Sequence, residues 1–147
     1  MQPIDIITFI LDEDVTVENF VNQFLHEEAS FMVSRFDNPD KFRQAVQANE
    51  DVRLVLLDVE LAQFKDYRLL DMIKYLHKER SGTYIIIVAR FDRSDPDSFG
   101  LIKEFVRIGV FDLVDKQDQS WKTDLQGALT RVTAKILFKL NLTKTYA

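Results

Sequence analysis

Acidic residues stand at the ends of two apolar runs in this chain, and a lysine follows a third run. Asp12 and Glu13 come after the first run, Asp58 after the second, and Lys116 after the third. If the runs are strands of one parallel sheet, their carboxyl ends meet at the edge where open α/β sheets bind ligands. Three carboxylates and an ammonium group at that edge would form a site for a hard cation such as Mg²⁺ beside a nucleophilic aspartate.

The three runs belong to a regular alternation of strand-like and helix-like segments. Strands are expected at residues 4–11, 31–36, 53–57, 84–89 and 111–114, and helices at 15–26, from 38, at 69–78, at 98–108 and from 121. Alternating units of this kind predict an α/β fold, a doubly wound parallel sheet with helices on both faces. The expected strands would bring the acidic residues and the lysine to a common edge.

Helical spacing also predicts which residues face the core. Leu25 continues the apolar face of the first helix, and Val106 lies on that of the fourth. Gly109 is expected to end the fourth helix, because glycine is common just after the last helical turn. The apolar periodicity of the last helix weakens from residue 140 onward. The sequence therefore predicts one domain over residues 1–140 and a C-terminal tail over 141–147.

Composition narrows the class of protein. A length of 147 residues favours a single domain, and the net charge of −5 argues against binding to nucleic acid or an anionic membrane surface. There is no cysteine, which excludes disulfides and thiolate metal sites. No run approaches the ~20 apolar residues that span a bilayer. No glycine-rich nucleotide-binding motif or GxSxG motif occurs. We expect a cytoplasmic domain that is not an enzyme.

In the order of its units and the placing of Asp12, Glu13, Asp58 and Lys116, the chain resembles the receiver domain of bacterial two-component response regulators. The match covers nearly the whole chain. The resemblance implies a flavodoxin-like, five-stranded sheet with strand order 2-1-3-4-5. It also implies that Asp58 accepts a phosphoryl group from a histidine kinase, and that Asp12, Glu13 and Asp58 bind Mg²⁺. Lys116 would contact the phosphoryl group.

The chain departs from the family pattern at several places, one of which is the stretch 90–98, which is longer than the family's usual loop and rich in Asp. Val88 and Ala89 stand where the family has a Thr or Ser hydroxyl at the end of strand 4. Leu113 replaces a switching aromatic residue, and Gln117 replaces the proline that follows the lysine. The family's glycine after strand 3 is absent from residues 62–66. These differences affect the relay from Asp58 more than the acidic site itself.

Two functional hypotheses follow. In the first, a histidine kinase or phosphotransfer protein phosphorylates Asp58, and a downstream protein partner binds the face formed by the fourth helix, last strand and last helix. In the second, the chain is a pseudo-receiver, a docking or dimerisation module that needs no phosphate. The missing hydroxyl and Leu113 favour the second, and the complete set of Asp12, Glu13, Asp58 and Lys116 favours the first. Pairing with a second copy of the chain is left open.

Overall fold

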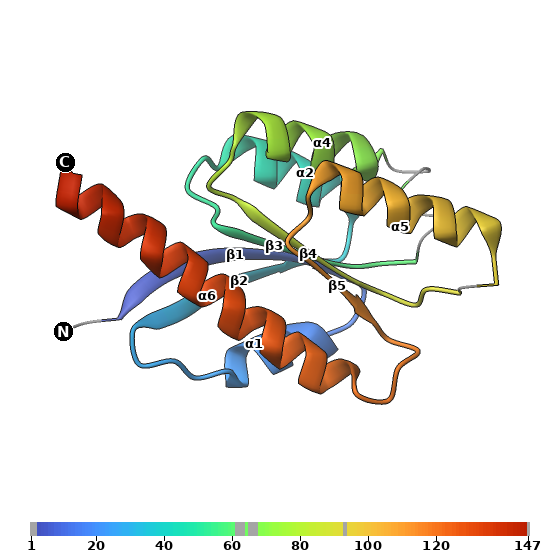
Figure 1. The fold of residues 1–147 in the computed structure, drawn as a ribbon, viewed down its shortest axis with the longest axis horizontal. Helices are drawn as coiled ribbons and strands as arrows, with labels where there is room; N and C mark the ends of the chain where they lie inside the picture. Colours follow the sequence, from blue (N-terminus) through green and yellow to red (C-terminus); the bar gives the residue numbers. More distant parts are fainter. Residues whose placement is uncertain (1–2, 61–63, 65–67, 93, 147) are drawn as a thin grey trace.

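The computed structural model describes the backbone of residues 3–60, 64, 68–92 and 94–146, and side chains up to residue 141 (Figure 1). The strands are β1 (Ile4–Asp12), β2 (Ala29–Phe36), β3 (Leu54–Asp58), β4 (Tyr84–Ala89) and β5 (Asp112–Asp115). The helices are α1 (Thr16–Gln23), α2 (Pro39–Ala48), α4 (Leu69–Glu79), α5 (Pro96–Ile108) and α6 (Trp121–Tyr146). The elements alternate along the chain as predicted.

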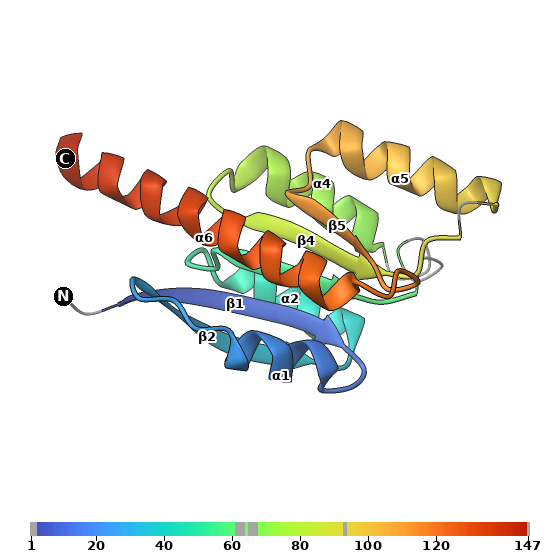
Figure 2. The same cartoon turned by 60° about the horizontal axis from the view of Figure 1, so that its bottom comes forward.

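All strand pairs are parallel, and the sheet has the order β2-β1-β3-β4-β5. Helices α2, α4 and α5 cover one face of the sheet, while α1 and α6 cover the other (Figures 1 and 2). This is the doubly wound, flavodoxin-like α/β fold that the sequence predicts. Strand order and helix placement together put the carboxyl ends of β1, β3, β4 and β5 along one edge of the sheet.

The core consists of two apolar layers, one on each face of the sheet. On the first face Phe64 and Phe105 stack edge to face at 5.0 Å between ring centroids, among residues of α2 and α4. On the second face the apolar side of α6, including Leu129 and Val132, packs against β1, β3 and β4. The side chains of β3 from Leu54 to Leu57 are fully buried, as expected for a central strand covered on both faces.

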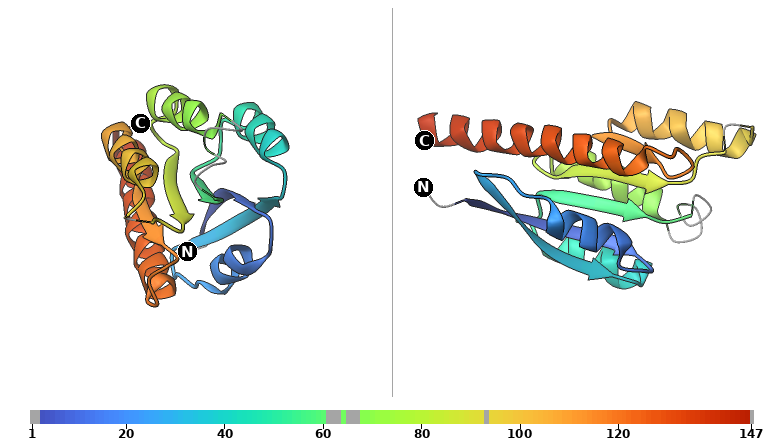
Figure 3. Two further views of the ribbon diagram at one scale, coloured as in Figure 1. Left: turned by 90° about the vertical axis from the view of Figure 1, so that its right-hand side faces the viewer. Right: turned by 90° about the horizontal axis from the view of Figure 1, so that it is seen from below.

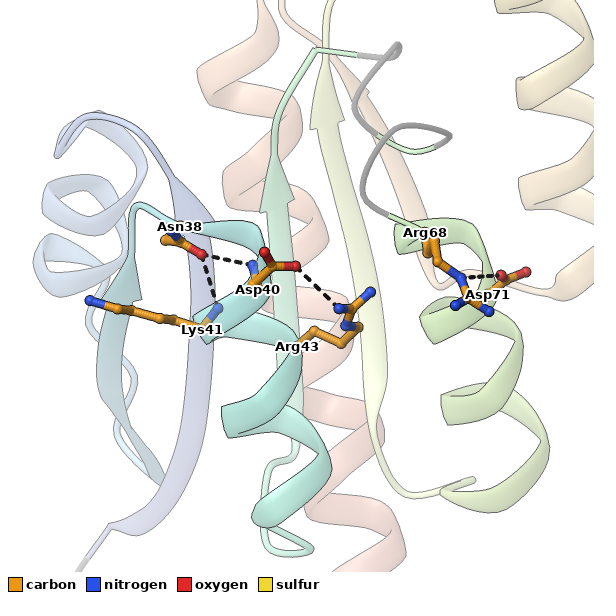
Figure 4. Close-up of polar contacts among 6 residues, drawn as sticks. All are labelled: Asn38, Asp40, Lys41, Arg43, Arg68 and Asp71. Carbon is orange, nitrogen blue, oxygen red and sulfur yellow. Dashed lines mark hydrogen bonds and ion pairs between the residues drawn. The ribbon is translucent and has the colours of Figure 1, made fainter.

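Local signals explain where the helices begin and end. Asn38 caps α2 by accepting hydrogen bonds from the backbone N–H groups of Asp40 and Lys41 at 2.9 and 3.1 Å (Figure 4). Proline follows at the first helical position of α2, where its missing N–H costs nothing. Gly109, with a φ of 94°, ends α5 in the left-handed conformation, as the sequence predicts.

Two core predictions are wrong. Leu25 is 87% exposed, because α1 ends at Gln23 and the chain turns away before this residue. Val106 is 67% exposed, because the face of α5 that packs on the sheet is centred on the neighbouring Phe105. In both cases the spacing of apolar residues overestimates the width or length of the buried face.

Helix α6 continues through Tyr146, and its C-terminal turns extend past the amino ends of the strands (Figures 1 and 3). The domain boundary at residue 140 stays a prediction. None of the helices in the described part of the chain is both long and apolar enough to cross a bilayer.

Candidate functional site

Asp12 and Asp58 are the last residues of β1 and β3 and lie directly opposite each other in the sheet. The two strands are neighbours, so the parallel register alone brings these two carboxylates together at the carboxyl edge. Asp12 is 3% exposed, and the Asp58 side chain is 8% exposed. Both carboxylates therefore lie largely out of water, where a negative charge is costly unless it is paired.

Lys116 provides the pairing charge for Asp58. Its Nζ donates to both carboxylate oxygens of Asp58 at 2.8 Å, and its side chain is 21% exposed. The backbone N–H of Lys116 also donates to the carbonyl of Ala89 at 2.8 Å, which holds the start of the β5–α6 connection against β4. On its other side, Lys116 Nζ lies 5.6 Å from the centre of the Trp121 ring. The ammonium group thus lies between Asp58 of β3 and Trp121 of α6, and the backbone of Lys116 is bonded to β4.

Among the described residues, the Asp12 carboxylate has no ammonium partner, and it instead caps the β1–α1 connection. Its carboxylate accepts hydrogen bonds from the backbone N–H of Asp14 at 3.0 Å and of Val17 at 3.4 Å. Burial raises the pKa of Asp12 to about 6, and the nearby charge of Asp58 adds to the rise, against the lowering effect of these hydrogen bonds. Near neutral pH Asp12 is therefore largely ionised at an energetic cost, which a cation bound beside it would reduce.

The pKa values of the other carboxylates follow their surroundings. Burial raises the pKa of Asp58 above its usual value, and the hydrogen bond from Lys116 counteracts part of this rise. Asp14 is exposed, and hydrogen bonds from Thr16 lower its pKa. For both Asp12 and Asp58, burial is the main cause of the raised pKa, so a cation bound beside them would favour their charged forms.

The predicted site residues line a single pocket of about 130 Å³ at the carboxyl edge of the sheet. Its walls are Asp12, Glu13, Asp14, Asp58, Val59, Glu60, Ala89, Arg90 and Lys116. The structure thus brings all four predicted site residues together, while their roles stay predictions. The segment 62–66, where the family has a glycine and this chain has none, lies mostly outside the described residues.

The pocket offers oxygen donors of the kind that Mg²⁺ prefers. Within the described part of the chain, no three Asp, Glu, His or Cys side chains already stand in a metal-ligating cluster. Glu13 lines the pocket with an exposed side chain, so it can rotate toward Asp12 and Asp58 without disturbing the core. The donor chemistry of the pocket therefore fits a hydrated divalent cation, while the role of Glu13 as one of its ligands stays a prediction.

The structure shows which residue at the end of β4 stands at the pocket, where the family has a hydroxyl side chain. Val88 packs into the core layer under α6, whereas Ala89 belongs to the opposite core layer and is among the residues that line the pocket. The end of β4 therefore offers no side-chain donor to a ligand on Asp58. Leu113 is half-buried and packs against the core layer on the α5 side, as expected for a residue of the last strand.

The sequence does not single out two residues, one that lines the pocket and one beside it. Arg90 follows Ala89 and adds a second cation to the pocket. Asp115 joins the two loops that flank it, because its Oδ1 accepts from the backbone N–H of Phe91 at 3.2 Å and of Gln117 at 3.0 Å. Applying the rule for strand ends to β4 as well as to the acidic strands would have found Arg90.

No protein-family model matches the chain, and no curated protein matches it significantly. Solved structures do. A response regulator from Thermotoga maritima aligns with a TM-score of 0.63 at 18% identity, over 91% of this chain and 99% of that one. The isolated REC domain of RcsB from Salmonella enterica serovar Typhimurium aligns with a TM-score of 0.62 at 17% identity. This alignment covers 88% of this chain and 89% of that one.

A third similar structure is NtrX from Brucella abortus, with a TM-score of 0.63 at 15% identity. It matches 98% of this chain, but the chain spans only 29% of that protein. All three similarities concern the whole α/β architecture rather than a part of it. The strand order, the helices on both faces and these neighbours agree: the fold of this chain is that of the response-regulator receiver domains.

Proposed function

We propose that this protein is a receiver that accepts a phosphoryl group on Asp58 from a histidine kinase or a phosphotransfer protein. The observation that carries the proposal is the bidentate contact of Lys116 with Asp58, beside the buried Asp12, in a pocket open to solvent. A surface ion pair would need no second buried carboxylate next to it. With two buried carboxylates, Asp12 and Asp58, and one paired cation, Lys116, the empty site is short of one positive charge.

In the proposed reaction, an Asp58 carboxylate oxygen attacks phosphorus, so that an O–P bond forms as the N–P bond to the donor histidine breaks. The departing imidazole keeps the bond's electron pair and takes up a proton. Asp12, Glu13 and Asp58 would hold Mg²⁺, which offsets the repulsion between the carboxylate and the phosphoryl oxygens. Lys116 then turns its ammonium group from the carboxylate to the new phosphoryl group.

Output would be contact with a downstream protein through the face formed by α5, β5 and α6. This face carries an apolar hollow lined by Phe91, Phe99, Ile102 and Leu113, with Asp115 at its border. Asp115 also accepts a hydrogen bond from the backbone N–H of Phe91, the residue after Arg90, so it links the hollow to the loop that lines the acidic pocket. A change at Asp58 therefore has a short path to this surface.

Incubation with acetyl phosphate and Mg²⁺ tests the proposal directly. Intact mass should rise by about 80 Da, the mass of one phosphoryl group, in the wild type but not in Asp58→Asn. Asp51→Asn, which removes an exposed carboxylate away from the pocket, is the matched control and should behave as the wild type. A wild type that gains no mass at any Mg²⁺ concentration would contradict the proposal.

A second candidate is the docking module that works without phosphate. Ala89 at the pocket favours it, because its side chain has no hydroxyl to draw the β4–α5 loop toward a phosphoryl group. The same mass measurement separates the two, since the docking module requires no change of mass. The paired Lys116 and Asp58 lead us to favour phosphoryl transfer.

A further inference from the structure

The charges around the pocket are strongly unbalanced. Five acidic side chains line it, namely Asp12, Glu13, Asp14, Asp58 and Glu60, against the two cations Lys116 and Arg90. Lys116 is occupied, because its ammonium group already donates to both oxygens of Asp58. A doubly charged anion that enters this pocket needs further positive charge. Arg90 is the remaining cationic side chain among the described residues that line it.

Arg90 is exposed, and its side chain makes no ion pair with the described part of the chain. Its backbone, in contrast, is anchored on both sides. The carbonyl of Ala89 accepts from Lys116 at 2.8 Å, and the N–H of Phe91 donates to Asp115 at 3.2 Å. A free guanidinium group therefore stands on a fixed piece of backbone at the rim of the pocket, close to the residue that holds Asp58.

We propose that Arg90 is a binding residue for the phosphoryl group carried by Asp58, because the Ala89 side chain has no polar atom that could bind it. This inference rests on the proposed function. The planar guanidinium group has five N–H donors in a fork that matches two phosphoryl oxygens at once, whereas an ammonium group acts as a point charge. Arg90 would thus hold the outer phosphoryl oxygens while Lys116 pairs with an inner one.

Beryllofluoride, which mimics a phosphoryl group on aspartate, is the probe for this site. Its binding with Mg²⁺ can be followed by the fluorescence of Trp121, the single tryptophan of the chain, which lies 5.6 Å from Lys116 Nζ. Arg90→Ala should weaken beryllofluoride binding about tenfold, because one charge-assisted hydrogen-bonding group is lost. Mg²⁺ alone should bind no more weakly, since the substitution removes a positive charge.

Two further variants separate a specific contact from a general effect of charge. Arg107→Ala, which removes an 80% exposed arginine on α5, is the matched control and should bind beryllofluoride as the wild type does. Ala89→Thr in the Arg90→Ala background should restore part of the lost affinity by supplying a hydroxyl donor.

The possible failures can be told apart. Unchanged affinity in Arg90→Ala, tighter binding in that variant, or an equal loss in Arg107→Ala would overturn the role of Arg90 and leave the proposed function standing. If the wild type neither binds beryllofluoride nor gains a phosphoryl group from acetyl phosphate, both the proposed function and this inference are wrong. Weakened binding confined to Arg90→Ala supports them together.

Discussion

The buried carboxylates Asp12 and Asp58 are the residues in which structure and chemistry conflict most directly. Each would be easier to bury as a neutral group, and each has a raised pKa in the folded protein. The register that makes them neighbours on β1 and β3 is the same register that buries the core of the sheet. The protein therefore gives up some stability to keep a charged site at this edge.

This conflict predicts a stability gain from Asp12→Asn. The pKa of Asp12 is about 6 in the folded protein, above the ordinary value of 3.8, so the folded state holds its proton to higher pH than the unfolded state. The stability of the wild type should then fall as pH rises between these two values. At pH 7.5 the variant should be more stable than the wild type by ~1–2 kcal/mol. The rise of the Asp12 pKa by about two units corresponds to about 3 kcal/mol, and the weaker hydrogen bonds of the substituted amide side chain to the β1–α1 connection offset part of this gain.

Urea unfolding from pH 4 to pH 8 measures this difference, which should vanish toward pH 4. Asp14→Asn is the control with the opposite sign. The pKa of the Asp14 carboxyl is lowered in the folded state, so Asp14 stabilises the wild type above its ordinary pKa and this stabilisation is lost on acidification. A gain in Asp12→Asn that does not change with pH would contradict the assignment of strain to the Asp12 charge.

At the scale of the elements, Arg80 ties the C-terminal end of α4 to that of α2. Its guanidinium group donates to the backbone carbonyls of Val46, Gln47 and Asn49, the last at 3.1 Å. These carbonyls lie at the C-terminal end of α2, where the Val46 carbonyl also accepts from the backbone N–H of Asn49 at 3.4 Å. The last carbonyls of a helix lack regular helical partners, and the helix dipole also favours a cation at this end. One side chain therefore completes the end of a neighbouring helix and fixes the distance between the two.

We expect Arg80→Ala to lower the free energy of unfolding by ~1–3 kcal/mol, because partly buried carbonyls would lose their donors. Arg80→Lys should recover only part of the lost free energy of unfolding, since an ammonium group lacks the forked donors of a guanidinium group and cannot reach all three carbonyls. The exposed Lys78→Ala on the last turn of α4 serves as control, and chemical denaturation provides the measurement. Equal losses in Arg80→Ala and Lys78→Ala would show that only charge near the helix end matters.

At the scale of the whole molecule, the pocket is assembled from the ends of β1, β3 and β4 and the start of the β5–α6 connection. A ligand that binds there contacts segments from across the sequence and binds only the folded state. Binding should therefore stabilise the entire domain rather than one loop.

Saturating Mg²⁺ should consequently raise the thermal midpoint of the wild type by about 5–10 °C, the shift expected for ligand at ~100 times its dissociation constant. Asp58→Asn should show a clearly smaller shift, and an equal ionic strength of NaCl should show none of this effect. Below pH 6 the shift should shrink, because protons compete for Asp12. An equal Mg²⁺ shift in Asp58→Asn would place the cation elsewhere.

Much of this architecture can be read directly from the chain. Strand β4 falls at residues 84–89, where the sequence predicts it, because a short run of β-branched residues between polar turns has few other stable conformations. Local patterning was less reliable at the ends and sides of helices. Leu25 and Val106 fit the apolar spacing, yet both are exposed, because spacing along one helix does not say where its neighbours stop covering it.

The sequence by itself determined the alternation of strands and helices, and through it the nearness of Asp12, Asp58 and Lys116. These follow from local periodicity and from the common direction of parallel strands. Only the tertiary structure decided that Ala89 rather than Val88 lines the pocket, that Asp115 joins the two loops, and that Arg90 stands free at the rim. Which way a side chain points at the end of a strand depends on register and on packing against distant segments, and neither is encoded in the spacing of nearby residues.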